Sequence, residues 1–109
     1  MKIVKESKII FEEKDVFGRR IRTTKNYWQK IFLIKHKELK VSKTQVIEVI
    51  KKPDEVRKSV QDPFIYLFYK KIGKKNLVVV IKYLNNHGFV VTIYETSKVK
   101  RKGEKIWPK

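Results

Sequence analysis

Apolar and polar residues alternate along the second half of the chain, and this period of two is typical of strands. After Asp54 the alternation predicts four strands, near residues 55–60, 64–71, 77–83 and 89–95. The connections between them are short and contain turn residues: Asp62-Pro63, Gly73 to Asn76, and Asn85 to Gly88. Consecutive strands joined so tightly predict an antiparallel meander.

The N-terminal part of the chain predicts two short strands. Residues 7–12 predict a short strand, and residues 19–23 predict a second one that pairs back across a turn at Asp15 and Gly18.

Two helices are predicted between these strands and the meander. The first begins at a threonine cap and covers about 23–38, with apolar side chains three to four positions apart. The second begins at Ser42, where Gln45 completes a capping box, and ends before Pro53. The predicted fold class is therefore α+β: short N-terminal strands, two helices, then a four-stranded antiparallel meander with the helices on one face. A chain of 109 residues fits one domain, 1–109.

The charge of the chain narrows the range of partners that the protein could bind. Lys and Arg number 28 against 11 Asp and Glu, a formal net charge of +17. Heat adaptation would raise glutamate together with lysine, and glutamate is not raised here. A surface this positive attracts polyanions, so we expect nucleic acid, and RNA above all, as the partner. An acidic protein partner and a membrane surface are the weaker alternatives.

Several classes of protein are excluded. The chain has no cysteine, which rules out a disulfide scaffold and thiolate zinc sites. No apolar run approaches the roughly 20 residues of a membrane-spanning helix, and the N-terminus lacks the apolar stretch of a signal peptide. We therefore expect no membrane partner and a cytoplasmic location by default.

Alternation places a polar group on one face of the predicted sheet. On the last strand Val91 and Ile93 suit the helix-covered face, whereas hydroxyl-bearing residues face the other way. Cations and a hydroxyl on neighbouring strands join them if the register allows, and the whole group is Arg57, Ser59, Lys82, Thr92, Tyr94 and Thr96. Any wet sheet face shows such residues singly. Together with the charge, the group predicts a single open pocket for a ribose-phosphate backbone.

Other chemistry finds little support. The four glycines stand apart, so there is no Gly-rich phosphate loop, and no paired carboxylates have metal-ligand spacing. We expect no metal and no cofactor. The two histidines are His36, at the end of the first predicted helix, and His87, in a hairpin loop; a lone histidine is more often structural than catalytic.

Several segments resemble the barnase/EndoU/colicin/RelE-like (BECR) nuclease superfamily, in a phage- and bacteria-associated uncharacterised branch. The order of elements is similar to the RelE-like microbial ribonuclease fold. The resemblance covers about residues 20–107 and rests on Tyr27-Trp28 with Ile31 and Lys35-His36, Pro53 to Ser59, Tyr66 to Lys70, Val78 to Lys82, and Phe89 to Thr96.

The resemblance implies a metal-independent endoribonuclease, in which the ribose 2′-hydroxyl attacks the adjacent phosphate. By this likeness His36 would be the base, Arg57 would bind phosphate, Lys82 would stabilise the developing charge and Thr92 would position the backbone. The RNA-binding residues would be Ser59, Tyr94, Thr96 and Lys98. A proline follows the histidine in the superfamily, and Lys37 stands there in this chain.

The sequence leaves three hypotheses about the function open. The protein is a ribonuclease, toxin-like or stand-alone; a nucleic-acid-binding domain without chemistry; or an interaction protein for an acidic, antitoxin-like partner. The oligomeric state and the RNA target are not indicated by the sequence.

Overall fold

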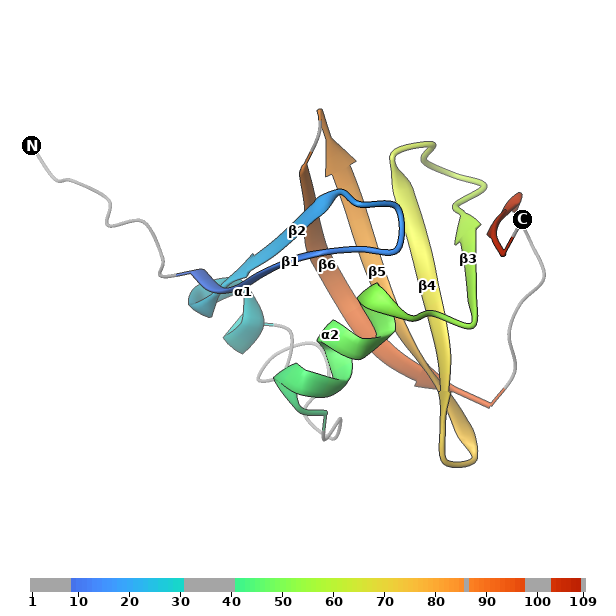
Figure 1. Ribbon diagram of the computed structural model, residues 1–109, viewed down its shortest axis with the longest axis horizontal. Coiled ribbons are helices and arrows are strands. Elements are labelled where there is room, and N and C mark those ends of the chain that lie inside the picture. The colour runs from blue at the N-terminus through green and yellow to red at the C-terminus, as the bar shows by residue number, and fades with distance from the viewer. Residues whose placement is uncertain (1–8, 31–40, 86, 98–102, 109) are drawn as a thin grey trace, which may run out of the picture.

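The structure, a computed structural model, describes residues 9–30, 41–85, 87–97 and 103–108. Within these residues seven strands form one sheet in the order β1-β2-β6-β5-β4-β3-β7 (Figure 1). The strands are β1 (Ile9–Lys14), β2 (Arg20–Thr24), β3 (Glu55–Lys58), β4 (Ile65–Ile72), β5 (Lys75–Leu84), β6 (His87–Thr96) and β7 (Lys105–Trp107). No helix among the described residues is both long enough and apolar enough to span a membrane.

The predicted fold class is wrong. The sheet is mixed and has seven strands among the described residues, not four antiparallel ones. The N-terminal hairpin does not stay separate, because β2 pairs in parallel with β6, Arg20 lying opposite His87. At the other edge β7 pairs antiparallel with β3. Both of these pairings join segments that are far apart in the chain. The pattern of apolar and polar residues within one strand does not indicate which distant strand it pairs with.

The helices are short. The first, α1 (Lys25–Lys30), is described for six residues. The predicted start is wrong, because Thr23 and Thr24 end strand β2, and residues 31–38 of the predicted helix lie outside the described residues. The second, α2 (Lys43–Lys51), begins as predicted: Ser42 accepts from the backbone N–H of Gln45, whose side chain accepts from the N–H of Ser42. Satisfying two amides in this way fixes the start of the helix.

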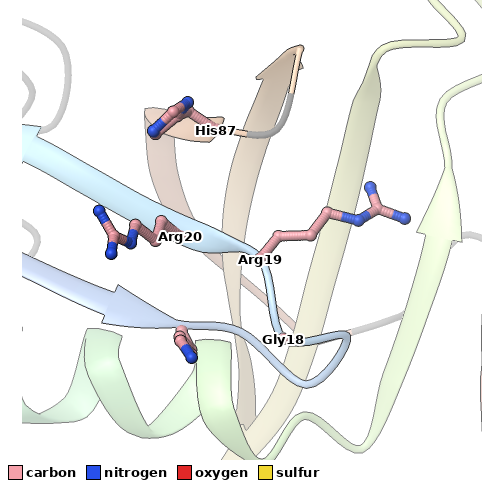
Figure 2. A pocket seen from close by; sticks show the side chains of 5 residues that line it. Gly18, Arg19, Arg20 and His87 are labelled. Atoms are coloured by element: carbon pink, nitrogen blue, oxygen red, sulfur yellow. The ribbon is translucent and has the colours of Figure 1, made fainter.

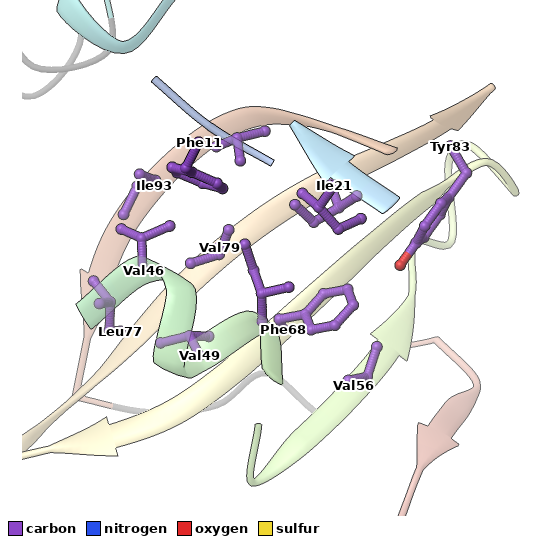
Figure 3. Packing of buried hydrophobic residues seen from close by; sticks show 13 residues of the cluster. Phe11, Ile21, Val46, Val49, Val56, Phe68, Leu77, Val79, Tyr83 and Ile93 are labelled. Carbon is purple, nitrogen blue, oxygen red and sulfur yellow. The ribbon is translucent and has the colours of Figure 1, made fainter. Parts of the chain in front are cut away.

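The core lies between α2, the N-terminal hairpin and one face of the sheet (Figure 3). On α2 the side chains of Val46, Val49 and Ile50 are fully buried. They meet apolar residues from six strands: Phe11, Ile21, Val56, Phe68, Leu77, Val79, Ile81, Tyr83, Val90 and Ile93. We call this side of the sheet the covered face.

The opposite side, which we call the second face, has its own smaller apolar cluster. Its members are Ile65, Leu67, Tyr69, Val78, Val80, Val91 and Tyr94. No described helix contributes to this cluster. Several of these side chains are only partly buried, so the second face is an accessible mixed surface.

A bulge in β6 decides which residues reach each face. Val80 pairs with Thr92 and Ile81 with Val90, so Val91 is an extra residue in the ladder. The expectation that Val91 faces the helices is therefore wrong: Val90 does so, and Val91 lies on the second face. Alternation cannot reveal an inserted residue.

Candidate nucleic-acid interface

The turn between β1 and β2 is held by one buried carboxylate. Asp15 is 6% exposed; its Oδ1 accepts from the backbone N–H groups of Phe17 and Arg19, both at 2.9 Å, and its Oδ2 accepts from the hydroxyl of Tyr83. Gly18 supplies the positive φ of +82° that the turn requires. Burial, followed by the hydrogen bond to Asp15, raises the pKa of Tyr83 far above its ordinary value. The turn is thus tied to β5.

Arg19 completes this attachment on the covered face. Its guanidinium carbon lies 4.4 Å from the ring centroid of Tyr83, 5.4 Å from that of Tyr66 and 5.2 Å from that of Phe17. Such stacking stabilises a cation on aromatic faces. Figure 2 shows Arg19 pointing across the sheet, away from Arg20 and His87.

A surface cavity of about 520 Å³ opens beside this turn (Figure 2). Among the described residues its lining holds no carboxylate; it consists of Lys14, Gly18, Arg19, Arg20 and His87. A wall with cations and a histidine suits a phosphate group, which accepts hydrogen bonds and carries negative charge.

Three of these residues form a row across neighbouring strands, which we call the basic row: Lys14, Arg20 and His87. Lys14 pairs with Arg20 on the β1–β2 ladder, and Arg20 pairs with His87 on the β2–β6 ladder. Directly paired residues point to the same face and lie about 5 Å apart at their Cα atoms. The register therefore aligns two cations and an imidazole.

The basic row lies on the second face. A Cβ on Gly88 would meet Ile21 and Ile81, both in the core, so position 88 points to the covered face. Its neighbour His87 therefore points the opposite way, and Arg20 does so because Ile21 is buried. Among the described residues, neither Lys14 nor Arg20 forms an ion pair with a carboxylate.

The residues predicted from sequence are spread over the second face. Arg57, Leu67, Val80 and Thr92 pair in turn across four strands, which puts about 14 Å of sheet between Arg57 and Thr92. Thr96 pairs with Asn76 near the far end of β6. Alternation had indicated one shared face, and they share it, but they do not line one pocket.

The two predicted cations already have acidic partners. Arg57 is 9% exposed, with its guanidinium bonded to Glu55 and, at 3.0 Å, to the carbonyl of Gly103. The Nζ of Lys82 lies 3.4 Å from Asp62 Oδ2. A phosphate role for Arg57 would require its largely buried ion pair to open, whereas the ion pair of Lys82 is partly exposed and opens more easily.

Two other predicted residues do share a pocket. Ser59 and Tyr94 line a cavity of about 200 Å³ together with Lys58, Val60, Gln61, Leu67 and Tyr69. Burial, with the neighbouring Tyr94 and Glu55, raises the pKa of Tyr69 to about 12. This lining is largely apolar and neutral, so it suits a phosphate less well than the basic row does. His36 and Lys98 lie outside the described residues.

Sequence reasoning missed Lys14, Arg20 and His87 as a group. They lie on three strands, and only the parallel β2–β6 pairing brings the first two to the histidine. The one signal in the sequence was a cluster of cations, Arg19 and Arg20, directly after the Asp15 turn.

Residues 32–95, more than half of the chain, match the family described as a domain of unknown function, DUF4258, and the chain belongs to this family. No curated protein and no solved structure matches it. His87 falls inside the matched residues, whereas Lys14 and Arg20 precede them.

Proposed function

We propose that this protein binds RNA at the basic row and cleaves it without a metal ion. The observation that carries the proposal is the alignment of two cations with an imidazole on one accessible face, in a pocket whose described lining holds no carboxylate. The net charge of +17 supports an anionic substrate. The likeness of several segments to the BECR nuclease superfamily supports the same chemistry, and we infer that the family is a branch of it.

The proposed reaction is transesterification within the substrate. His87 accepts the proton of a ribose 2′-hydroxyl, whose oxygen attacks the adjacent phosphorus. Lys14 and Arg20 stabilise the added negative charge on the phosphoryl oxygens. The bond to the 5′-oxygen breaks, that oxygen takes a proton from solvent, and the products are a 2′,3′-cyclic phosphate and a 5′-hydroxyl.

Incubation of the purified full chain with mixed RNA in excess chelator tests the reaction. We expect fragments that end in a cyclic phosphate. His87→Ala should lower the cleavage rate by about 10²- to 10⁴-fold, the usual contribution of a proton-transferring side chain. His36→Ala, in the same assay, decides between His87 and the base predicted by the resemblance.

Lys74→Ala is the matched control for charge. Lys74 is exposed in the β4–β5 turn, roughly 30 Å of strand away from His87. The Lys74→Ala variant should therefore cleave RNA like the wild type. RNA that stays intact at high protein concentration would contradict the enzyme proposal. RNA that is bound but uncut would favour the second candidate, a nucleic-acid-binding domain without chemistry, for which the same basic row is the supporting observation.

A further inference from the structure

Phe89 is an exposed aromatic ring in the middle of a strand. It is 38% exposed, although it lies in β6 between Gly88 and Val90, both buried. Alternation with Val90 places the ring on the second face, the same face as His87, which is two residues earlier on β6. The ring therefore lies beside the basic row. Because packing in an apolar core would bury the ring, filling a core does not explain why an aromatic residue stands at this exposed position.

Cations stand on both sides of this ring. On the β2–β6 ladder Phe89 pairs with Arg22, and on the β5–β6 ladder it pairs with Lys82. Directly paired side chains on one face lie about 5 Å apart at their Cβ atoms. The order across three strands is thus cation, aromatic ring, cation.

Each of these cations lies in a partly exposed ion pair with one carboxylate, although the Nε atom of Arg22 is itself buried. The Nε of Arg22 lies 3.4 Å from Glu12 Oε1, and Lys82 Nζ lies 3.4 Å from Asp62 Oδ2. The two cationic side chains are 32% and 41% exposed. Ion pairs exposed to this degree contribute little, so a phosphate can replace the carboxylates at small cost.

We propose that Phe89 stacks on an unpaired base of single-stranded RNA, while Arg22 and Lys82 contact the flanking phosphates. The inference rests on the proposed function, since it extends the basic row into a longer track for the same substrate. An aromatic ring on a sheet surface, with cations beside it, is the arrangement that recognises single strands without reading sequence. A base in a duplex is stacked on both sides and cannot cover the ring.

The binding experiment uses a short RNA carrying 2-aminopurine, whose fluorescence falls when the base stacks. The wild type should quench it, and should bind the single strand more tightly than the same sequence in a hairpin stem. Phe89→Ala should weaken single-strand binding about 5- to 150-fold, the range of one stacked base. Its quenching should disappear, while the salt dependence of its binding stays unchanged because no charge is removed.

Two further variants keep the result interpretable. Phe89→Trp retains a large ring and should restore quenching. Phe64→Ala removes an aromatic side chain of 58% exposure from the turn that precedes β4, and this variant should bind like the wild type. Thermal melting of each variant confirms that it folds.

The outcomes separate this inference from the proposed function. If Phe89→Ala binds like the wild type while Arg20→Ala is weakened, stacking is wrong and the basic row still binds RNA. Equal affinity for single strands and stems would also overturn the inference. If the wild type binds no RNA at all, the proposed function fails and the stacking site fails with it.

Discussion

Asp15 shows how much a single residue organises here. Its carboxylate accepts two backbone N–H groups and the hydroxyl of Tyr83 while it is almost completely buried. Because Lys14 directly precedes it and Arg20 follows the turn, the same hydrogen bonds set the geometry of the basic row.

The first prediction concerns this carboxylate. Asp15→Ala should lower the free energy of unfolding by about 3–5 kcal/mol, since it leaves buried donors unsatisfied and hydrogen bonds to a charged group are the strong ones. Tyr83→Phe removes one of the three bonds and should cost less, about 1–3 kcal/mol. Urea denaturation of both variants measures the difference, and equal costs would contradict the assignment.

The second prediction uses the tyrosine at the small cavity. Burial raises the pKa of Tyr69 to about 12, above its ordinary value of 10.0. The folded state therefore keeps this proton between pH 10 and 12 while the unfolded chain loses it. The contribution of Tyr69 to the free energy of unfolding is fully present below pH 10 and is lost as the pH rises through that window. At pH 11 this one group shifts the unfolding equilibrium roughly tenfold.

Tyr69→Phe removes that group and so isolates its effect from the titration of the many lysines. Denaturation at pH 9 and pH 11 should show a smaller loss of stability in Tyr69→Phe than in the wild type. An identical loss in both proteins would show that Tyr69 titrates normally.

At the scale of elements, the edge strand β7 is joined to the sheet through only a few residues. It pairs with β3 at Val56 and Arg57, and Arg57 also donates to the carbonyl of Gly103 just before β7. The ring centroid of Trp107 lies 6.3 Å from that of Phe17, which connects β7 to the turn beside the basic row.

The third prediction tests this attachment. Arg57→Leu should lower the free energy of unfolding by about 3–5 kcal/mol, because it leaves Glu55 half-buried without its partner. In a Trp28→Phe background, the emission of Trp107 should shift to the red as β7 detaches. Replacing Glu55 by Leu as well should recover part of the stability. A double variant as unstable as the single one would show that the ion pair is not the cause.

At this scale the sequence predicted some elements and missed others for a physical reason. The cap of α2 is local, since Ser42 and Gln45 are three residues apart, and it was predicted correctly. The four later strands were also located from alternation. The parallel β2–β6 pairing, the bulge at Val91 and strand β7 depend on distant partners, so no local period encodes them.

The same distinction applies to the candidate site. Alternation correctly put Lys82 and Tyr94 on one face, but distance along and across the sheet separates the predicted group. The basic row needed the register of three strands. The roles predicted for His36 and Lys98 stay predictions, as does the acidic protein partner.

Over the whole molecule, the excess of positive charge determines how the proposed binding of RNA should respond to salt. The fourth prediction is that the logarithm of affinity falls linearly with the logarithm of salt, with a slope of about −0.7 per phosphate contacted on a single strand. Lys14→Ala with Arg20→Ala should make the slope shallower by about 1.4. Lys74→Ala with Lys75→Ala removes the same charge at the far turn and should leave the slope nearly unchanged.

A titration of labelled RNA at several salt concentrations measures these slopes. Equal changes in both double variants would mean that charge acts only as a diffuse field, with no localised phosphate contacts at the basic row.

The parallel ladder between β2 and β6 also has a consequence for biosynthesis. Arg20 is synthesised 67 positions before His87, and the two can become neighbours only after β6 has been made. Closing so long a loop is slow and entropically costly. A nascent chain in which β6 is still inside the ribosome therefore lacks the assembled basic row, so the RNA binding that we propose for this row can begin only after β6 has emerged.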